Sequence, residues 1–178
     1  MAFIFKRVSV FGGVLAAASV LGACSSISLQ PAASSALIET KGNSVTGFVR
    51  FTPQNGSVLV AGEVRGLAPN KEHGFHIHEK GDCSSGDGMS AGGHFNPLGK
   101  AHGAHEHAEH HAGDLVSLKA DANGVARFSY TTNAITVNEG ATNIVGRGLI
   151  VHRDPDDYKT QPTGNSGPRV ACGVIAME

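Results

Sequence analysis

A pair of histidines two residues apart is the first feature of this chain that could do chemistry. Residues 74–83 read GFHIHEKGDC, so His76 and His78 flank Ile77 and are soon followed by Cys83. Side chains alternate between the two faces of a β-strand, and both imidazoles would therefore point the same way, about 6–7 Å apart. Such a pair can bind one metal ion, or it can be two half-buried polar side chains on an open sheet face. The pair alone leaves both interpretations open.

A second, longer segment carries most of the remaining histidines. Residues 90–114 read SAGGHFNPLGKAHGAHEHAEHHAGD and contain His94, His102, His105, His107, His110, His111 and Asp114. Neutral imidazole is the commonest metal ligand and suits zinc and copper, and a carboxylate within such a cluster suits zinc. One further histidine, His152, ends the apolar run GLIVH. This composition predicts a metal-binding protein.

The segments that must position these histidines are predicted to be short β-strands. The chain has 24 glycines, no tryptophan and no long periodic apolar stripe, which favours turn-rich β structure over helices. The turn signals PQNG and KADAN each separate two strand-like runs. We expect eight strands near residues 36–41, 44–52, 57–64, 73–79, 114–118, 124–131, 148–152 and 169–176. The fold class is therefore all-β, an antiparallel barrel or sandwich. Residues 80–113 and 153–168 are two long loops, and loops of that length are usually functional.

The N-terminus is predicted to be a secretory signal rather than a structural element. Lys6 and Arg7 precede an uncharged apolar stretch over residues 8–21, which is too short for a membrane span. The sequence LGAC at residues 21–24 resembles a bacterial lipoprotein processing box, which implies cleavage before Cys24 and lipid on that cysteine. The alternative is ordinary cleavage near Ala23 with an incidental cysteine. We expect a signal peptide over 1–23, a lipidated flexible tether over 24–36 and one domain over 37–178.

The number of cysteines and the net charge restrict the class of protein further. The three cysteines are Cys24, Cys83 and Cys172, and a secreted chain with an odd cysteine needs a role for the leftover thiol. If Cys24 carries lipid, Cys83 and Cys172 are free to pair in an oxidising compartment. Removing residues 1–23, with their two basic residues, from a 178-residue chain of net charge −1 leaves 155 residues of net charge −3. A domain with this net charge lacks the excess of basic residues that is typical of nucleic-acid-binding proteins.

Five blocks of the sequence together resemble the copper/zinc superoxide dismutase family, in its bacterial periplasmic, lipoprotein-type branch. The blocks are GFHIHEKGDC, SAGGHFNP, HHAGDL, LIVHRDPDDY and GPRVACGVI, in the family's order across residues 40–176. The resemblance implies an eight-stranded antiparallel Greek-key barrel or sandwich, and dismutation of superoxide to oxygen and hydrogen peroxide. Copper and zinc ions would be the cofactors and superoxide the small anionic substrate.

The resemblance also assigns residues. It implies copper ligands His76, His78, His94 and His152, and zinc ligands His94, His102, His111 and Asp114, so that His94 bridges both metals and carries a proton during turnover. Asp156 would link the copper ligand His76 to the zinc ligand His102, with adjacent Asp157 as the competing candidate. The resemblance also pairs Cys83 with Cys172 in a disulfide.

Arg169 corresponds to the family arginine beside the open copper position, where it attracts the anionic substrate; the alternative is a surface salt bridge. Lys100 and Lys80 are weaker candidates for steering superoxide. Cys83 lies eleven residues before His94, a placement similar to the bacterial branch. That departure puts the eukaryotic dimer interface in doubt and leaves monomer and homodimer both open.

Two other classes of function use similar residues. A metal carrier or sensor on this scaffold would be expected to lack a copper ligand or Arg169, and the sequence has all of them. A zinc or copper buffer is suggested by His105, His107 and His110, which the family pattern does not need; they form either a solvated loop or an auxiliary metal site that assists loading. We expect a location in the periplasm or cell envelope, lipid-anchored to a membrane and, because Ser25 rather than an aspartate follows Cys24, to the outer membrane.

Overall fold

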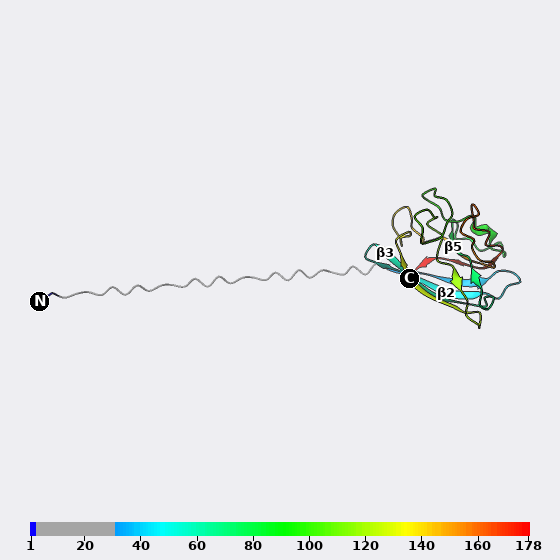
Figure 1. The fold of residues 1–178 in the computed structure, drawn as a ribbon, viewed down its shortest axis with the longest axis horizontal. Coiled ribbons are helices and arrows are strands. Elements are labelled where there is room, and N and C mark those ends of the chain that lie inside the picture. Colours follow the sequence, from blue (N-terminus) through cyan, green and yellow to red (C-terminus); the bar gives the residue numbers. More distant parts are fainter. Residues whose placement is uncertain (3–30) are drawn as a thin grey trace.

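The main feature of the fold is one curled antiparallel sheet (Figure 1). The computed structural model describes residues 1–2 and 31–178, and the predicted signal sequence after its second residue, Cys24 and most of the expected tether lie outside them. The eight strands of the main sheet lie in the order β5-β8-β9-β1-β2-β3-β7, with β10 paired to β1. Their bounds are β1 Ala33–Glu39, β2 Thr46–Gln54, β3 Ser57–Arg65, β5 Phe75–His78, β7 Ala126–Thr132, β8 Gly148–His152, β9 Arg169–Val174 and β10 Ala176–Met177.

Three smaller elements complete the described part of the chain. The strands β4 (Glu72–His73) and β6 (Leu118–Lys119) form a separate two-stranded sheet, and Met89–Ala91 forms the single 3₁₀ turn η1. All strand pairings are antiparallel, so the predicted all-β antiparallel class is confirmed. Among the described residues, no helix has the length and apolar character needed to cross a membrane.

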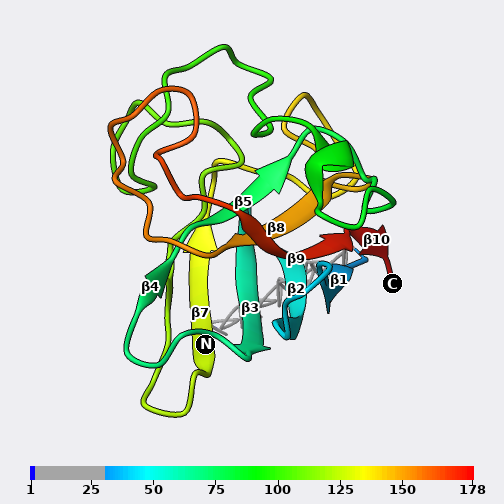
Figure 2. The same cartoon turned by 90° about the vertical axis from the view of Figure 1, so that its right-hand side faces the viewer.

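Strand β1 joins the two halves of the sheet. It pairs with β2 and β10 through residues 33–37, and with β9 through Ile38 and Glu39. A strand that changes partner in this way turns the sheet, and Figure 2 shows β5, β8 and β9 lying across the end of β2, β3 and β7. Along the sheet, β3 is followed by β7 rather than by β5, which lies beside β8, so the chain crosses between the two halves as in a Greek key.

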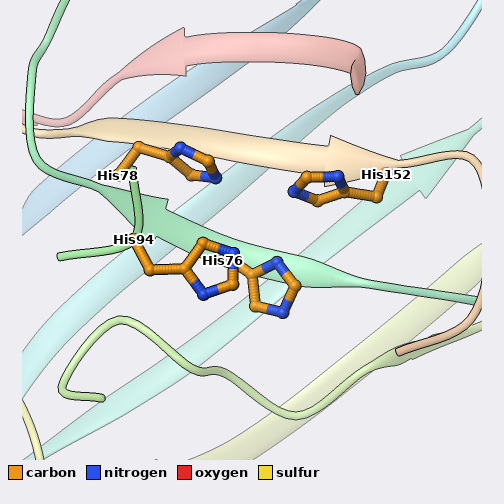
Figure 3. A group of neighbouring side chains, drawn as sticks. All are labelled: His76, His78, His94 and His152. Atoms are coloured by element: carbon orange, nitrogen blue, oxygen red, sulfur yellow. The ribbon is translucent and has the colours of Figure 1, made fainter. Parts of the chain in front are cut away.

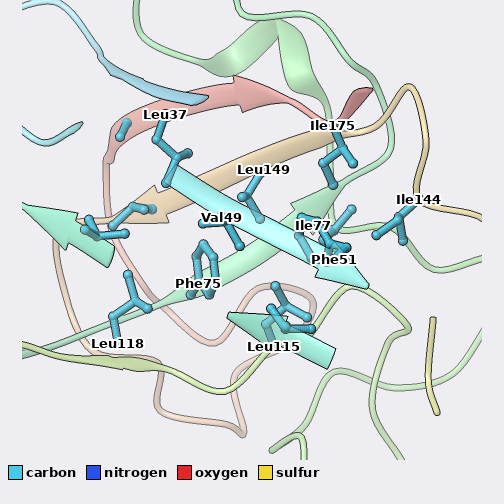
Figure 4. Close-up of a cluster of buried hydrophobic side chains, with 14 of the residues drawn as sticks. Leu37, Val49, Phe51, Phe75, Ile77, Leu115, Leu118, Ile144, Leu149 and Ile175 are labelled. Carbon is cyan, nitrogen blue, oxygen red and sulfur yellow. The ribbon is translucent and has the colours of Figure 1, made fainter. Parts of the chain in front are cut away.

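The core fills the inside of the curl. Along β2, Val49 and Phe51 are buried while Phe48 and Arg50 are exposed, which is the period-two alternation of a half-buried strand. On β5, Phe75 and Ile77 join this core (Figure 4). His76 and His78 consequently project from the opposite face of β5, toward the two long loops.

Turn chemistry fixes the register of the first hairpin. Asn55 and Gly56 both have positive φ, 45° and 84°, and connect Gln54 to its partner Ser57. Two-residue hairpin loops of this kind require left-handed residues, and Asn-Gly is a favoured pair for them. The turn predicted from PQNG is confirmed.

Several predicted boundaries differ in the structure: the strand predicted over 73–79 is divided at Gly74 into β4 and β5, which lie in different sheets, and three further boundaries also differ. The strand β1 begins at Ala33, which is fully buried, so residues 33–36 belong to the sheet and not to the expected tether. The run 114–118 is a strand only at Leu118–Lys119, because its start and its end pair with different strands: the N–H of Leu115 donates to Phe75 of β5, whereas Leu118 lies opposite His73 of β4. The run 169–176 breaks at Ile175, whose N–H donates to Arg147 of the loop before β8, and β10 then pairs with β1.

Candidate metal centre

Four histidines, called the first group below, converge where β5 and β8 lie side by side. Strand β5 provides His76 and His78, the end of β8 provides His152, and the loop 80–113 provides His94 (Figure 3). One ligand atom from each lies within 4.8 Å of the others, and all four residues are buried. The pairing of β5 with β8 ends at Phe75–Val151, and the N–H of His152 donates to Gly74 at 2.8 Å. The sheet register therefore sets His152 beside His76.

The long loop reaches this cluster by pairing with the free edge of β5. The N–H of Phe95 donates to Ile77, and the N–H of Ile77 donates to Gly113. Isolated bridges consequently place His94 opposite His78 and Asp114 opposite His76. A side chain at Gly113 would collide with the carbonyl of Ile77, so the close approach requires glycine.

A second group shares His94 with the first. His94, His102, His111 and Asp114 are all buried and also bring one ligand atom each within 4.8 Å. The Nδ1 atoms of His94, His102 and His111 lie 2.8, 3.0 and 3.3 Å from Asp114 carboxylate oxygens. Three imidazole nitrogens and one carboxylate oxygen are a donor set typical of zinc.

The hydrogen bonds around the first group leave one nitrogen of each ring free. His78 Nδ1 donates to the Gly92 carbonyl at 2.9 Å, and His152 Nδ1 donates to the Gly167 carbonyl at 3.0 Å. Within the described part of the chain, four nitrogens of this group are buried without a hydrogen-bond partner: His76 Nδ1, His78 Nε2, His94 Nε2 and His152 Nε2. Buried nitrogens without partners are costly unless a ligand satisfies them. Four imidazoles are a suitable donor set for copper, so these residues fit that metal.

Burial favours the neutral form of three histidines of the first group, and metal ligation requires neutral imidazole. Burial lowers the pKa of His78 and His152 well below the usual value, and lowers that of His94 to about 4. The second group differs. Burial lowers the pKa of His102, but hydrogen bonds to Asp114 and Asp156 outweigh it and raise that pKa to about 9. Burial likewise opposes ionisation of Asp114, and the hydrogen bonds of His102, His111 and His94 nevertheless hold its pKa far below the ordinary value.

Asp156 connects the two groups. His76 Nε2 lies 2.7 Å from one of its carboxylate oxygens, and His102 Nε2 lies 2.9 Å from the other. Adjacent Asp157 is exposed and accepts hydrogen bonds from Lys159 and Thr160 of its own loop. The geometry thus distinguishes the two acids that the sequence left open, and it selects Asp156.

Arg169 lies beside the first group in a hollow of about 350 Å³. It is opposite His152 across the β8–β9 pairing, and its guanidinium donates to the carbonyls of Gly88 and Gly92. This half-buried side chain makes no salt bridge to any other residue in the described part of the chain, which argues against the alternative of a surface ion pair. The lining residues are His78, Met89, His152, Thr163, Asn165, Ser166, Gly167, Pro168 and Arg169.

The predicted disulfide is present. Cys83 and Cys172 are bonded, with their Cα atoms 5.8 Å apart. Cys172 is on β9, three residues after Arg169, and Cys83 is in the loop that contains Gly88 and Gly92. The bond therefore fixes the loop carbonyls to the strand that contains the arginine they hold.

Other predicted residues lie elsewhere. Lys100 donates to the carbonyl of Ala108 at 2.8 Å and lines a different hollow from Arg169. Lys80 is exposed and does not line the hollow of Arg169. The half-buried His105 and His110 and the exposed His107 lie outside both histidine groups, on the outer side of the loop.

Three supporting residues were not found from the sequence. The Gly92 carbonyl accepts hydrogen bonds from both His78 and Arg169, and the Gln161 side chain holds both the N–H and the carbonyl of His102. Gly164 has φ of 63°, and a side chain there would collide with the Asp156 carboxylate. Only the glycines had a sequence signal, because loops rich in glycine often need positive φ or close approach.

The comparisons with known proteins agree with this geometry. The family model for copper/zinc superoxide dismutase (SODC) matches residues 45–175. Superoxide dismutase [Cu-Zn] 2 of Aquifex aeolicus (strain VF5) is 41% identical over 167 residues, covering 92% of this chain and 96% of the relative. Superoxide dismutase [Cu-Zn] of Paramecium bursaria Chlorella virus 1 is 42% identical over 137 residues, covering 74% of this chain and 72% of the relative.

A solved structure gives the same result for the fold. The crystal structure of the clock protein EA4 superposes with a TM-score of 0.75 at 40% identity, covering 83% of this chain and 96% of the other. The fold and the paired histidine groups define a two-metal β-sheet enzyme. This chain belongs to the copper/zinc superoxide dismutase family. Its activity is the dismutation of superoxide, with copper and zinc as cofactors.

Proposed function

We propose that His76, His78, His94 and His152 hold the copper, that His94, His102, His111 and Asp114 hold the zinc, and that Arg169 docks the substrate. The observation that carries this assignment is the set of four buried, unpartnered nitrogens in the first group, each on a ring oriented through its other nitrogen. When bound, copper supplies one-electron redox chemistry, and zinc supplies positive charge without redox change.

The proton chemistry is proposed for His94. One superoxide is oxidised to oxygen, and a second takes up the electron and two protons to become hydrogen peroxide. His94 Nε2 faces the first group, and its Nδ1 lies 2.8 Å from Asp114 in the second. Nε2 can therefore hold one of these protons and release it to the reduced substrate, while the Asp114 side keeps the ring in place. A proton donor fixed in this way is a general acid in position.

Arg169 gives the substrate its docking charge. Its guanidinium borders the hollow into which His78 and His152 also face. The carbonyls of Gly88 and Gly92 hold it without neutralising it, because a carbonyl carries only a partial charge. A fixed cation beside the metal ligands raises the local concentration of a small anion such as superoxide.

The cellular role proposed is protection of the cell envelope from superoxide outside the cytoplasm, with the enzyme anchored through lipid on Cys24. The support is the sequence LGAC after an apolar stretch, followed by Ser25. Changing Cys24 to Ser should move the mature protein from the membrane to the soluble periplasmic fraction. Wild-type protein found wholly soluble would contradict the anchor and leave the catalytic proposal untouched.

A superoxide-decay assay on metal-loaded protein tests the catalytic roles and excludes a carrier or a buffer. The wild type should accelerate decay catalytically, whereas a carrier or buffer would bind metal without turnover. His94→Ala removes the shared ligand and the proposed proton donor, and we expect the rate to fall by about a hundredfold or more. Equal rates for this variant and the wild type at equal copper content would refute the bridging role.

A further inference from the structure

Two histidines outside the catalytic groups are arranged like metal ligands. His105 Nδ1 donates to the carbonyl of Asp114 at 2.9 Å, and His110 Nδ1 donates to the carbonyl of His111 at 2.7 Å. In a neutral imidazole, a ring nitrogen that donates a hydrogen bond leaves the other nitrogen with a free lone pair. Both rings therefore have Nε2 available, and an oriented ring of this kind is characteristic of metal-binding histidine.

The spacing of the two rings suits a shared ion. Their centroids are 5.3 Å apart, with 53° between the ring planes. The centroids of the ligand pairs His94–His111 and His102–His111 are each 5.5 Å apart. Two imidazoles on a tetrahedral ion at a bond length of about 2.0–2.1 Å place their centroids about 5 Å apart. The outer pair thus has the spacing of the zinc-type pairs a few residues away.

A solvent-reachable hollow of about 540 Å³ lies against both rings, and its lining includes Glu106 and His107 as further donors. A second, smaller hollow of about 290 Å³ is also lined by His105 and His110. Lys100 lines the larger hollow too, but its ammonium group donates to the carbonyl of Ala108. An ion that enters from solvent can therefore meet two imidazole nitrogens at the wall of the hollow, and the exposed side chain of Glu106 or His107 would have to turn toward it to add a third donor.

We propose that His105 and His110, completed by Glu106 or His107, form an auxiliary site for a borderline divalent cation, Zn²⁺ or Cu²⁺, on the outer side of the loop. The site binds more weakly than the two catalytic groups, because only two of its ligands are held by hydrogen bonds and the others are exposed. It is independent of turnover, since neither ring lies in the catalytic groups.

The test is a Co²⁺ titration of full-length mature protein already loaded with copper and zinc. Tetrahedral Co²⁺ with nitrogen ligands gives visible absorption, and we expect one additional equivalent to bind to the wild type. The double variant His105→Asn with His110→Asn keeps a side-chain N–H that can donate to the same carbonyls but removes both Nε2 ligands. Its affinity for the additional Co²⁺ should fall at least tenfold. The control Glu109→Gln changes a charge on the same loop without touching the lining of the hollow, and it should bind like the wild type.

The outcomes separate this site from the catalytic assignment. A dismutase rate equal to wild type in the fully loaded double variant, together with loss of the additional Co²⁺, supports the proposal. Equal Co²⁺ binding in the wild type and the double variant overturns it. Loss of zinc from the loaded double variant also overturns it, because His105 or His110 would then belong to the zinc site itself. Co²⁺ binding and zinc retention are measured separately from the dismutase rate, so failure of this proposal can be told apart from failure of the catalytic assignment.

Discussion

His78 and Arg169 donate hydrogen bonds to the same acceptor, the carbonyl oxygen of Gly92, at 2.9 and 2.6 Å. One loop carbonyl therefore orients a proposed copper ligand and positions the proposed docking arginine. The loop that supplies this carbonyl is bonded to β9 through Cys83 and Cys172. The orientation of His78 and the position of Arg169 therefore both depend on the Gly92 carbonyl, and a change in this loop should affect both metal binding and substrate docking.

Arg169→Glu should slow turnover while leaving metal content unchanged, because it reverses the charge at the hollow without removing a ligand. The rate at low ionic strength should fall most, and its dependence on salt should flatten or invert, since salt screens the interaction of separated charges. Superoxide decay measured from low to high salt checks this. The control is Arg153→Glu, an exposed arginine that pairs with Asp154 outside the hollow. An unchanged rate for Arg169→Glu at low salt would remove Arg169 as the docking residue.

Asp156→Asn should weaken metal retention, because a carboxylate that holds both His76 and His102 becomes an amide with only one acceptor oxygen. Loss of such a partner typically reduces metal affinity about 10–100-fold. Competition with a chelator, followed by metal analysis, measures this loss. Asp157→Asn is the matched control, since its carboxylate touches only its own loop. If both variants retained metal equally well, the linking role of Asp156 would be wrong.

Replacing both Cys83 and Cys172 with serine should lower the free energy of unfolding by about 2–5 kcal/mol, the usual contribution of a native disulfide. The bond spans 89 residues of sequence and anchors the loop that holds Arg169. We therefore expect a lower rate as well, even in protein with full metal content. Denaturant unfolding and the decay assay measure the two effects separately. Wild-type activity in the fully loaded variant would show that the loop does not need the bond to position Arg169.

Zinc binding to the metal-free protein should release about one proton at pH 7. His102 has a pKa raised to about 9 and is protonated there, while the lowered pKa of Asp114 means that its carboxylate is already ionised. Zinc requires a neutral imidazole, so apparent affinity should rise with pH up to about 9 and then level off. Calorimetry in buffers of different ionisation enthalpy counts the proton. Affinity that does not change between pH 7 and 9 would contradict the raised pKa.

The members of the two histidine groups were predicted, mainly through the family resemblance, whereas the residues that orient them were mostly not. Strand periodicity alone places His76 and His78 on one face of β5, away from Phe75 and Ile77 in the core. The backbone acceptor at Gly92 could not be predicted, because every residue has a carbonyl and only the tertiary fold decides which one faces a histidine. Asp156 and Asp157 are equivalent in composition, and the loop conformation alone separates them.

Strand boundaries failed for a related reason. The run 114–118 reads as a strand by residue type, but its first residues pair with the edge of β5 and only Leu118 begins the pairing with β4. The start of β1 was placed late because Ser34 and Ser35 read as part of a polar tether, although the sheet buries Ser35. The residue types around Ser34 do not indicate that this segment pairs with β10, which lies at the other end of the chain.

The auxiliary pair should also affect how quickly the zinc site fills. His105 and His110 are hydrogen-bonded to the backbone of Asp114 and His111, two of the proposed zinc ligands. An ion held by the pair would therefore restrict the segment that must close around zinc, and it would raise the local concentration of metal beside it. The variant with His105→Asn and His110→Asn should reload zinc more slowly than the wild type when metal-free protein meets limiting Zn²⁺. The difference should vanish at excess Zn²⁺, and Glu109→Gln should reload like the wild type. Stopped-flow competition with a zinc-binding dye measures these rates. Equal reloading rates at limiting Zn²⁺ would mean that metal bound by the outer histidines does not speed the filling of the zinc site.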